Sequence, residues 1–179
     1  MAIYNTYIQQ LDFNGTDYTK GPVIDLLEKY NIISQEFPFC KNPKPKSLPT
    51  RDWAGEDGLD VYVPKALPVG NYEIEVTFLY KGTEQTMRQD IAGFIDYLYG
   101  RNEDAVGSRF AVYDEYTGLG RKDIVVSGID NEIFYLSDAD PDAVAQFKVK
   151  FMVYDPTTEV TPTTATVSGT TTVTDLNFE

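Results

Sequence analysis

The clearest hydrophobic pattern lies in the middle of the chain. Apolar and polar residues alternate over residues 72–80, which is the period of a half-buried β-strand. Gly82 breaks this pattern, and apolar residues then recur at offsets of 4, 7, 8 and 11 from Met87, the spacing of one helix face. The pattern predicts a strand followed by a helix over residues 84–99, with Gly100 just past the helix end.

Strand patterns resume after this helix. A Tyr-Thr-Gly-Leu-Gly loop separates the first two of them, and its Gly118 and Gly120 permit the positive backbone angles of a hairpin loop. The last and strongest alternates inward-facing apolar residues with Gln146, Lys148 and Lys150 on the outer face. The four strand segments are 109–115, 122–129, 131–136 and 144–155.

Periodicity is weak in the N-terminal third. Residues 25–30 predict one or two helical turns, and residues 59–63 alternate as a short strand. Four prolines between them exclude regular structure, because proline lacks an N–H donor and restricts the residue before it. We therefore predict an N-terminal arm and extended loop region over residues 1–68. The four are Pro38, Pro43, Pro45 and Pro49.

The composition changes again at Thr157. The remaining segment, 157–179, is rich in threonine and carries a Ser-Gly turn signal, which favours a small hairpin. A hairpin alone buries almost nothing, so we expect this segment to be disordered unless something covers it. It is therefore predicted to be a C-terminal arm or small hairpin beside a core of residues 69–156.

These elements define a fold class. We predict a mainly β (α+β) protein: an antiparallel β-sandwich or barrel flanked by one α-helix, with extended N- and C-terminal arms. The composition agrees, because 42% of the residues are hydrophobic, enough for a real core. Thirteen Tyr and ten Phe favour a sheet-rich one, since aromatic side chains fit a pleated surface.

The net charge of −13 limits the partners of this protein. Nucleic acids and anionic membranes bind through Lys and Arg, so neither is an expected partner. The acidity either maintains solubility or provides a surface that DNA passes without binding. Residues 41–51 are a basic exception, which is either a solvated connector or an arm that docks onto an acidic neighbouring subunit. The positive residues there are Lys41, Lys44, Lys46 and Arg51.

The sequence carries no recognisable targeting or disulfide signal. Cys40 is the only cysteine, so no disulfide can form within the chain. The first ten residues lack a signal peptide pattern, and no apolar run approaches the roughly 18 residues of a membrane span. We expect synthesis and assembly in a cytoplasm.

Enzymatic chemistry finds little support. The chain has no histidine, which excludes Ser/His/Asp and Cys/His nucleophilic arrangements and removes the commonest metal ligand. No phosphate-binding loop occurs, and the Gly118–Gly120 loop precedes a strand rather than a helix. We therefore predict no catalytic residue, no cofactor-binding residue and no cofactor.

Two clusters of carboxylates are candidate sites. Asp138, Asp140 and Asp142 alternate as in calcium loops, but Ala143 and Val149 stand where such a loop requires Gly and Glu. We interpret them as an acidic turn between strands and predict no metal.

The second cluster surrounds Trp53. A glycosidase needs two carboxylates beside an aromatic platform, and four acidic residues lie near this indole in the sequence. Nothing in their spacing fixes the separation of two carboxyl groups, so a solvated loop remains the simpler interpretation. The four are Asp52, Glu56, Asp57 and Asp60.

Six aromatic residues lie in the weakly periodic N-terminal third. Aromatic side chains are enriched where interfaces bury them, so we interpret this group as candidate anchors for another subunit. They are Tyr4, Tyr7, Phe13, Tyr18, Phe37 and Phe39.

The order of elements resembles a known fold family. A long strand, one amphipathic helix, a hairpin and a final long strand follow in residues 72–82, 90–100, 107–129 and 144–156. This order is similar to the tail-tube fold of long-tailed bacteriophages, shared by tail tube proteins and the N-terminal domain of distal tail proteins. The resemblance implies a β-sandwich flanked by one helix, with six subunits forming a ring around a channel. The resemblance does not extend to the galectin-like domain that many distal tail proteins carry after the ring domain, so tube, terminator and baseplate ring subunits are all expected possibilities.

The resulting functional hypothesis is a non-enzymatic subunit of a bacteriophage tail. We expect a homo-oligomer, a hexameric ring, that contacts other tail or baseplate proteins in the virion and lets DNA pass without specific binding. The alternative is a carbohydrate-binding β-sandwich module, with Trp53 as stacking platform and calcium at the Asp138 turn. An acidic-site hydrolase is a third possibility.

Overall fold

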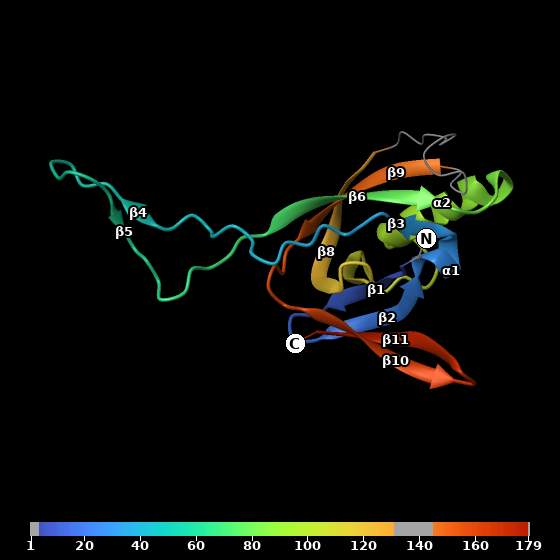
Figure 1. Ribbon diagram of the computed structural model, residues 1–179. Helices are drawn as coiled ribbons and strands as arrows, with labels where there is room; N and C mark the ends of the chain where they lie inside the picture. Colours follow the sequence, from blue (N-terminus) through green and yellow to red (C-terminus); the bar gives the residue numbers. More distant parts are fainter. Residues whose placement is uncertain (1–3, 131–144, 179) are drawn as a thin grey trace.

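The structure is a computed structural model that describes residues 4–130 and 145–178. Its centre is a seven-stranded antiparallel sheet with the strand order β2-β1-β7-β8-β9-β6-β3 (Figure 1). Its strands are β1 (Thr6–Phe13), β2 (Tyr18–Asp25), β3 (Ile32–Ser34), β6 (Tyr72–Tyr80), β7 (Arg109–Asp114), β8 (Leu119–Ile129) and β9 (Ala145–Val153).

One face of this sheet packs against helix α2 (Glu84–Leu98). The predicted apolar stripe forms the contact: Phe94 is fully buried, with its ring 5.2 Å from that of Phe78 on β6 and 6.2 Å from that of Phe147 on β9. The short helix α1 (Leu26–Tyr30) is capped by Asp25, whose carboxylate accepts the N–H groups of the first turn. The large aromatic core therefore lies between the sheet and α2.

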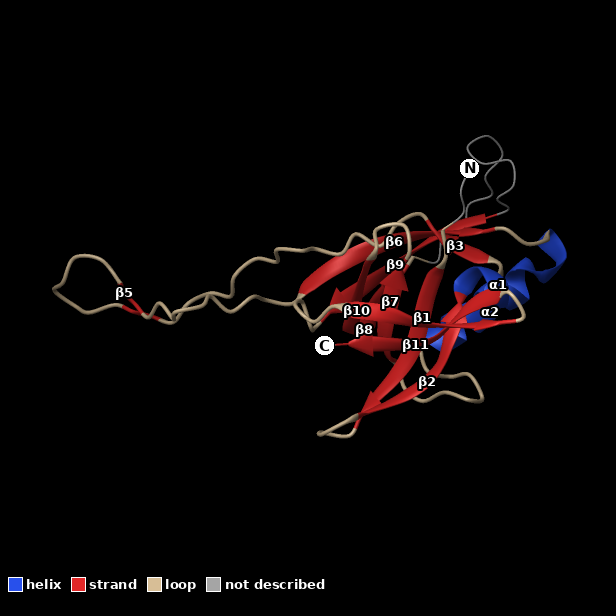
Figure 2. Ribbon diagram, turned by 60° about the horizontal axis from the view of Figure 1, so that its bottom comes forward, coloured by secondary structure: helices blue, strands red, loops and turns tan. Residues whose placement is uncertain are grey.

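The opposite face packs against a second, two-stranded sheet formed by β10 (Val160–Val167) and β11 (Thr170–Phe178) (Figure 2). Successive residues of a strand point to opposite faces, so Phe110 of β7 enters the helix-side core while Ala111 contacts the hairpin. Ala111 forms a small buried cluster with Leu11, Val160 and Leu176.

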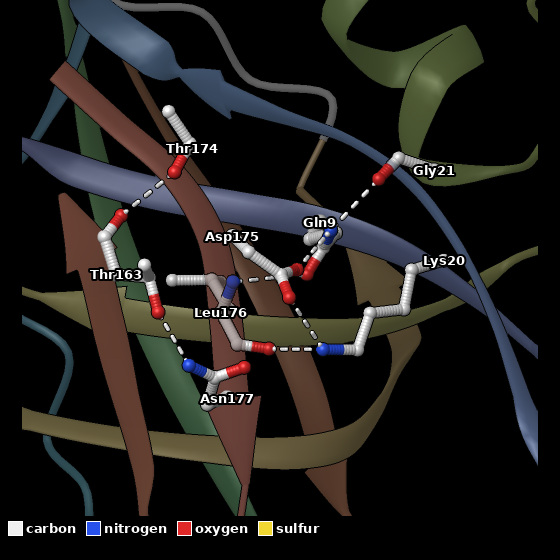
Figure 3. A network of polar contacts seen from close by, with 8 residues as sticks. All are labelled: Gln9, Lys20, Gly21, Thr163, Thr174, Asp175, Leu176 and Asn177. Carbon is white, nitrogen blue, oxygen red and sulfur yellow. Dashed lines mark hydrogen bonds and ion pairs between the residues drawn. The ribbon is translucent and has the colours of Figure 1, made fainter. Parts of the chain in front are cut away.

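Polar contacts add to this second interface (Figure 3). Gln9 is 2% exposed, and its amide nitrogen donates to the Gly21 carbonyl and to the Asp175 carboxylate. Its amide oxygen accepts from the Leu176 N–H. Lys20 donates to the other oxygen of Asp175 and to the Leu176 carbonyl.

The predicted fold class is confirmed. The protein is mainly β, its strands pair antiparallel, two sheets pack face to face, and α2 is the one long helix of the described residues. The predicted elements at 72–80, 84–99 and 144–155 correspond to β6, α2 and β9. The strand predicted at 131–136 lies outside the described residues.

The N-terminal prediction was wrong in its first part. Residues 6–25 are not an arm, because β1 and β2 form a hairpin within the main sheet, with β1 paired to β7. The extended region begins only after β3, beyond Phe37 and Phe39. These two rings are 1% and 8% exposed and belong to the core, so they are not anchors for another subunit.

The other four aromatic candidates are less buried. Tyr7 and Tyr18 are partly buried against the cluster beneath the C-terminal hairpin. Tyr4 and Phe13 remain 46% and 42% exposed. Tyr4 and Phe13 are therefore the most exposed of the six candidates.

The C-terminal segment forms the predicted small hairpin, and the chain's own sheet covers it. The cover that the prediction requires for an ordered hairpin is therefore supplied within the chain, and the alternative of an arm that becomes ordered only beside a neighbour does not apply. The role assigned to Gly120 also changes. Its backbone lies beside β10, where a Cβ would meet the Val160 carbonyl oxygen at 2.7 Å, whereas Gly118 has the expected positive φ of 65°.

Candidate functional site: a projecting arm

The element that leaves the body of the protein is the segment of residues 41–70, which we call the arm. Figures 1 and 2 both show it as a long two-stranded ribbon that extends away from the packed sheets. Its outgoing part, residues 41–51, is called the stem, and residues 52–63 are called the tip. Each half of the arm is about 15 residues long, so it can reach at most about 50 Å from the body.

The ribbon is held by few backbone contacts. Strand β4 (Thr50–Arg51) pairs with β5 (Asp60–Val61), and nearer the body Lys46 N–H donates to the Pro68 carbonyl at 2.8 Å. Gly70 N–H donates to the Lys44 carbonyl at 3.0 Å. Prolines along both halves remove donors, so a continuous ladder cannot form. The strand predicted over 59–63 is thereby reduced to two residues.

The tip and the return strand expose apolar side chains. Six large hydrophobic residues of the arm are between 42% and 69% exposed, a concentration that soluble proteins rarely leave uncovered without a binding role. They are Trp53, Leu59, Val61, Tyr62, Val63 and Leu67.

Trp53 has two polar neighbours at the tip. The guanidinium of Arg51 lies 3.5 Å from the centre of its ring, a cation–π contact, and the indole N–H donates to the Asp60 carboxylate at 2.8 Å. These contacts order the tip locally. They also cover one face of the ring that a sugar would need for stacking.

The arm and the body differ in charge. The arm holds five basic and four acidic residues, whereas the rest of the chain holds ten basic and 24 acidic ones. The stem alone contains four basic residues and no acidic one, and Lys41, Lys44 and Lys46 are all exposed. Because the body of every copy is acidic, it attracts the basic stem of any other copy.

A buried arginine holds the root of the arm. Arg121 of β8 is 2% exposed and donates to the carbonyl oxygens of Gly120 and Cys40, at 2.9 and 3.4 Å. The Cys40 N–H in turn donates to the Tyr72 hydroxyl at 3.2 Å. Cys40 and Tyr72 flank the arm on its two sides, so this set joins its outgoing and returning ends.

The electrostatics of the root follow from this burial. Burial raises the pKa of Tyr72, while the hydrogen bond from Cys40 and the charge of Arg121 partly oppose the shift. Within the described residues no carboxylate pairs with Arg121, and its Nε atom has no hydrogen-bond acceptor. Sequence reasoning missed this group, because one Arg in a strand pattern carries no signal of burial.

The predicted acidic clusters do not converge into a site. Asp52, Glu56, Asp57 and Asp60 all lie on the exposed tip, and of these Asp60 contacts the indole of Trp53. In the part of the chain that the structure describes, no group of three acidic or cysteine side chains is arranged to hold a metal ion. The Asp138, Asp140 and Asp142 cluster lies outside the described residues.

Neither sequence comparison identifies the protein. No protein-family model matches the sequence, and no curated protein matches it significantly. Among the described residues, no helix has the length and apolar character needed to cross a membrane.

One similar solved structure is the Dit protein (gp 19.1) of SPP1, described as a paradigm of the hub adsorption apparatus in Gram-positive infecting phages. The sequence identity is 17% and the TM-score 0.47, over 89% of this chain and 54% of that one. This chain therefore spans about half the length of Dit. A likeness this weak leaves functional assignment to the residues of the chain itself.

Proposed function

We propose that this protein is a structural subunit that associates with copies of itself through the arm. The observation that carries the proposal is a ribbon that leaves the body, exposes six large apolar side chains and has a basic stem. Burying exposed apolar surface against another copy is favourable, and the acidic body attracts the stem.

The edges of the main sheet add a second route to association. Strands β2 and β3 each have one neighbour among the described strands, so each leaves backbone groups available on its outer side. Pairing of edges around a closed ring removes such edges, and cyclic head-to-tail contacts need no self-complementary patch. A ring is therefore the assembly that this architecture favours.

More specifically, we propose a subunit of a bacteriophage tail, of the tail tube or distal tail (baseplate ring) type. The support is the order of long strand, amphipathic helix, hairpin and long strand, which β6, α2, β7–β8 and β9 follow. Hexameric rings of an acidic protein would enclose a channel that repels DNA phosphates and lets DNA slide. Other tail proteins are its expected partners, the virion its location and the host cytoplasm its place of assembly. The absence of histidine supports a role without catalysis.

The test is the assembly state of the purified chain and of an arm variant. We expect sedimentation velocity to show concentration-dependent oligomers and negative-stain microscopy to show rings. Tyr62→Asp with Val63→Asp places two charges on the exposed tip and should yield monomers of unchanged fold. Tyr154→Asp, at a 57% exposed position on the body, is the matched control. A wild-type chain that stays monomeric at every concentration would refute the proposal.

A further inference from the structure

A groove of about 360 Å³ lies between the C-terminal hairpin and the main sheet. The sheet contributes Tyr7 of β1, Tyr113 of β7 and Glu115 just after β7. The hairpin contributes the opposite wall, which includes Pro162 and Thr172. None of these residues belongs to the arm.

The groove combines aromatic and acidic character. Tyr7 and Tyr113 are direct partners in the β1–β7 register, so their side chains lie together on one face of the sheet. The exposed Glu115 accepts the Asn5 N–H at 2.9 Å through one carboxylate oxygen, Oε2. Burial, together with the charges of Asp25 and Glu115, raises the pKa of the Tyr7 hydroxyl. A ligand of this groove is therefore expected to be flat-sided or ring-bearing and positively charged.

The stem has that chemistry. Its sequence, Lys-Asn-Pro-Lys-Pro-Lys-Ser-Leu-Pro-Thr-Arg, combines three prolines with four cations in eleven residues. Proline fixes the backbone near the polyproline conformation, so an extended segment of this kind loses little entropy on binding. Extended proline-bearing segments dock in aromatic-lined grooves, and neighbouring carboxylates favour Lys and Arg at their flanks.

We propose that the Tyr7–Tyr113–Glu115 groove of one copy binds the stem of a second copy's arm. The inference rests on the proposed self-association and names the surface that receives the arm. Figure 1 shows the arm leaving the body on one side while the turn of the β10–β11 hairpin points to the other. The contact is therefore head-to-tail, which generates a ring or a filament rather than a two-fold dimer.

Disulfide trapping in the full-length chain tests this contact. Ser47→Cys on the stem and Thr172→Cys on the groove wall, both at exposed positions, are combined in a Cys40→Ser background. Under mild oxidation we expect covalent oligomers from the double variant, and a covalent dimer when the two single variants are mixed. Ser47→Cys paired with Asp104→Cys, an exposed position in the loop after α2, is the control and should cross-link at least tenfold less.

A charge exchange provides an independent measurement. Glu115→Lys should weaken association about fivefold, the size expected for a pair that water partly screens. Combining it with Lys44→Glu should restore association, whereas combining it with Lys29→Glu, on α1 of the body, should not. Rescue of Glu115→Lys by Lys44→Glu and not by Lys29→Glu would support binding of the stem in this groove.

The outcomes separate this inference from the function on which it rests. Oligomers that form without preferential Ser47–Thr172 cross-linking would overturn the groove assignment and leave self-association intact. A chain that forms no oligomer in any of these experiments would overturn both.

Discussion

The Lys20 ammonium group lies 3.0 Å from the Asp175 carboxylate, although 155 residues separate them along the chain. Lys20 belongs to β2, at one edge of the main sheet, and Asp175 to β11 of the C-terminal hairpin. Gln9 of β1 lies beside this pair and reaches both the other carboxylate oxygen of Asp175 and the Leu176 N–H (Figure 3). The N-terminal and C-terminal hairpins are thus one packed unit, and two of the predictions below concern their attachment.

The first prediction is that Gln9→Ala loosens the C-terminal hairpin. The substitution leaves the buried Leu176 N–H and the Gly21 carbonyl without this partner, and each loss costs free energy because water cannot replace it fully. We expect the free energy of unfolding to fall by about 3 kcal/mol and amide exchange to quicken over residues 160–178. Thr172→Val, at an exposed site of the same strand, is the control; equal effects of the two variants would contradict the role of Gln9.

A second prediction concerns pH. Burial raises the pKa of Asp175, but the hydrogen bonds from Gln9 and Lys20 and the Lys20 charge outweigh it and hold the pKa below the ordinary 3.8. A folded-state pKa below the unfolded one gives stability that is complete above about pH 4 and lost as the pH falls through the folded value. Asp175→Asn should therefore lose less stability than the wild type between pH 6 and pH 3 in urea unfolding.

Asp25 provides a control of opposite sign for that experiment. Its burial raises the pKa of the carboxyl group, and the N–H groups of Glu28 and Leu27 only partly offset the shift. A raised folded-state pKa gives a contribution to stability that is complete below about pH 3.8 and is lost as the pH rises through the folded-state pKa. Asp25→Asn should therefore lose more stability on acidification than the wild type. If Asp175→Asn and Asp25→Asn changed the pH dependence of stability in the same direction, the opposite pKa shifts of the two carboxyl groups would be contradicted.

The third prediction tests the helix-side core. Phe94 is 0% exposed and contacts the rings of Phe78 and Phe147, so Phe94→Ala should cost about 4 kcal/mol and Phe94→Asp should abolish folding. Gln89→Ala, at an exposed site of the same helix, should change stability by less than about 0.5 kcal/mol. Circular dichroism and urea unfolding measure both. Wild-type stability in Phe94→Asp would mean that this helix face is not buried.

Truncation tests how far the C-terminal hairpin contributes to the fold. Removing residues 157–179 deletes Val160 and Leu176 from the small cluster but leaves the helix-side core intact. We expect a folded sheet of reduced stability, and weaker association because one wall of the proposed groove is lost. Circular dichroism and sedimentation velocity distinguish the two effects. Complete unfolding of the truncated chain would mean that the hairpin belongs to the essential core.

The sequence predicts the strongly periodic elements well because each buries one regular face. It fails at β1, where Gln9 and Gln10 interrupt the apolar alternation although they are only 2% and 1% exposed. Tertiary partners satisfy both: Gln10 donates to the Tyr97 carbonyl and to Asn102, and accepts from the Val106 N–H. No local pattern shows that such partners exist, so the sequence predicts an arm where the structure has this strand.

For the arm, the local character is readable from the sequence but the attachment to the body is not. Its prolines and cations were apparent in the sequence, and they correctly predicted an extended basic segment. Its attachment to the body is not predictable from local pattern, because Cys40 at its root is bonded by Arg121, which lies about fifty residues beyond Tyr72. The same holds for the groove, whose walls come from three distant parts of the chain.

The last prediction is that Arg121 aims the arm more than it stabilises the fold. Its charge is buried without a carboxylate partner among the described residues, so Arg121→Met, which removes that charge and keeps most of the volume, should change stability by less than about 1 kcal/mol. The Cys40 carbonyl nevertheless loses its donor, and the root of the arm loses one of its two ties.

Spin labels on Asp57→Cys at the tip and Lys29→Cys on the body, in a Cys40→Ser background, should therefore give a broader distance distribution in Arg121→Met. Arg109→Met, which removes the pair with Asp123 away from the root, should leave that distribution unchanged. An arm without a fixed direction must be ordered when it binds, and this ordering costs free energy. We therefore also expect association to weaken in Arg121→Met but not in Arg109→Met. An unchanged distance distribution would show that the arm takes its direction from its own ribbon and not from the buried arginine.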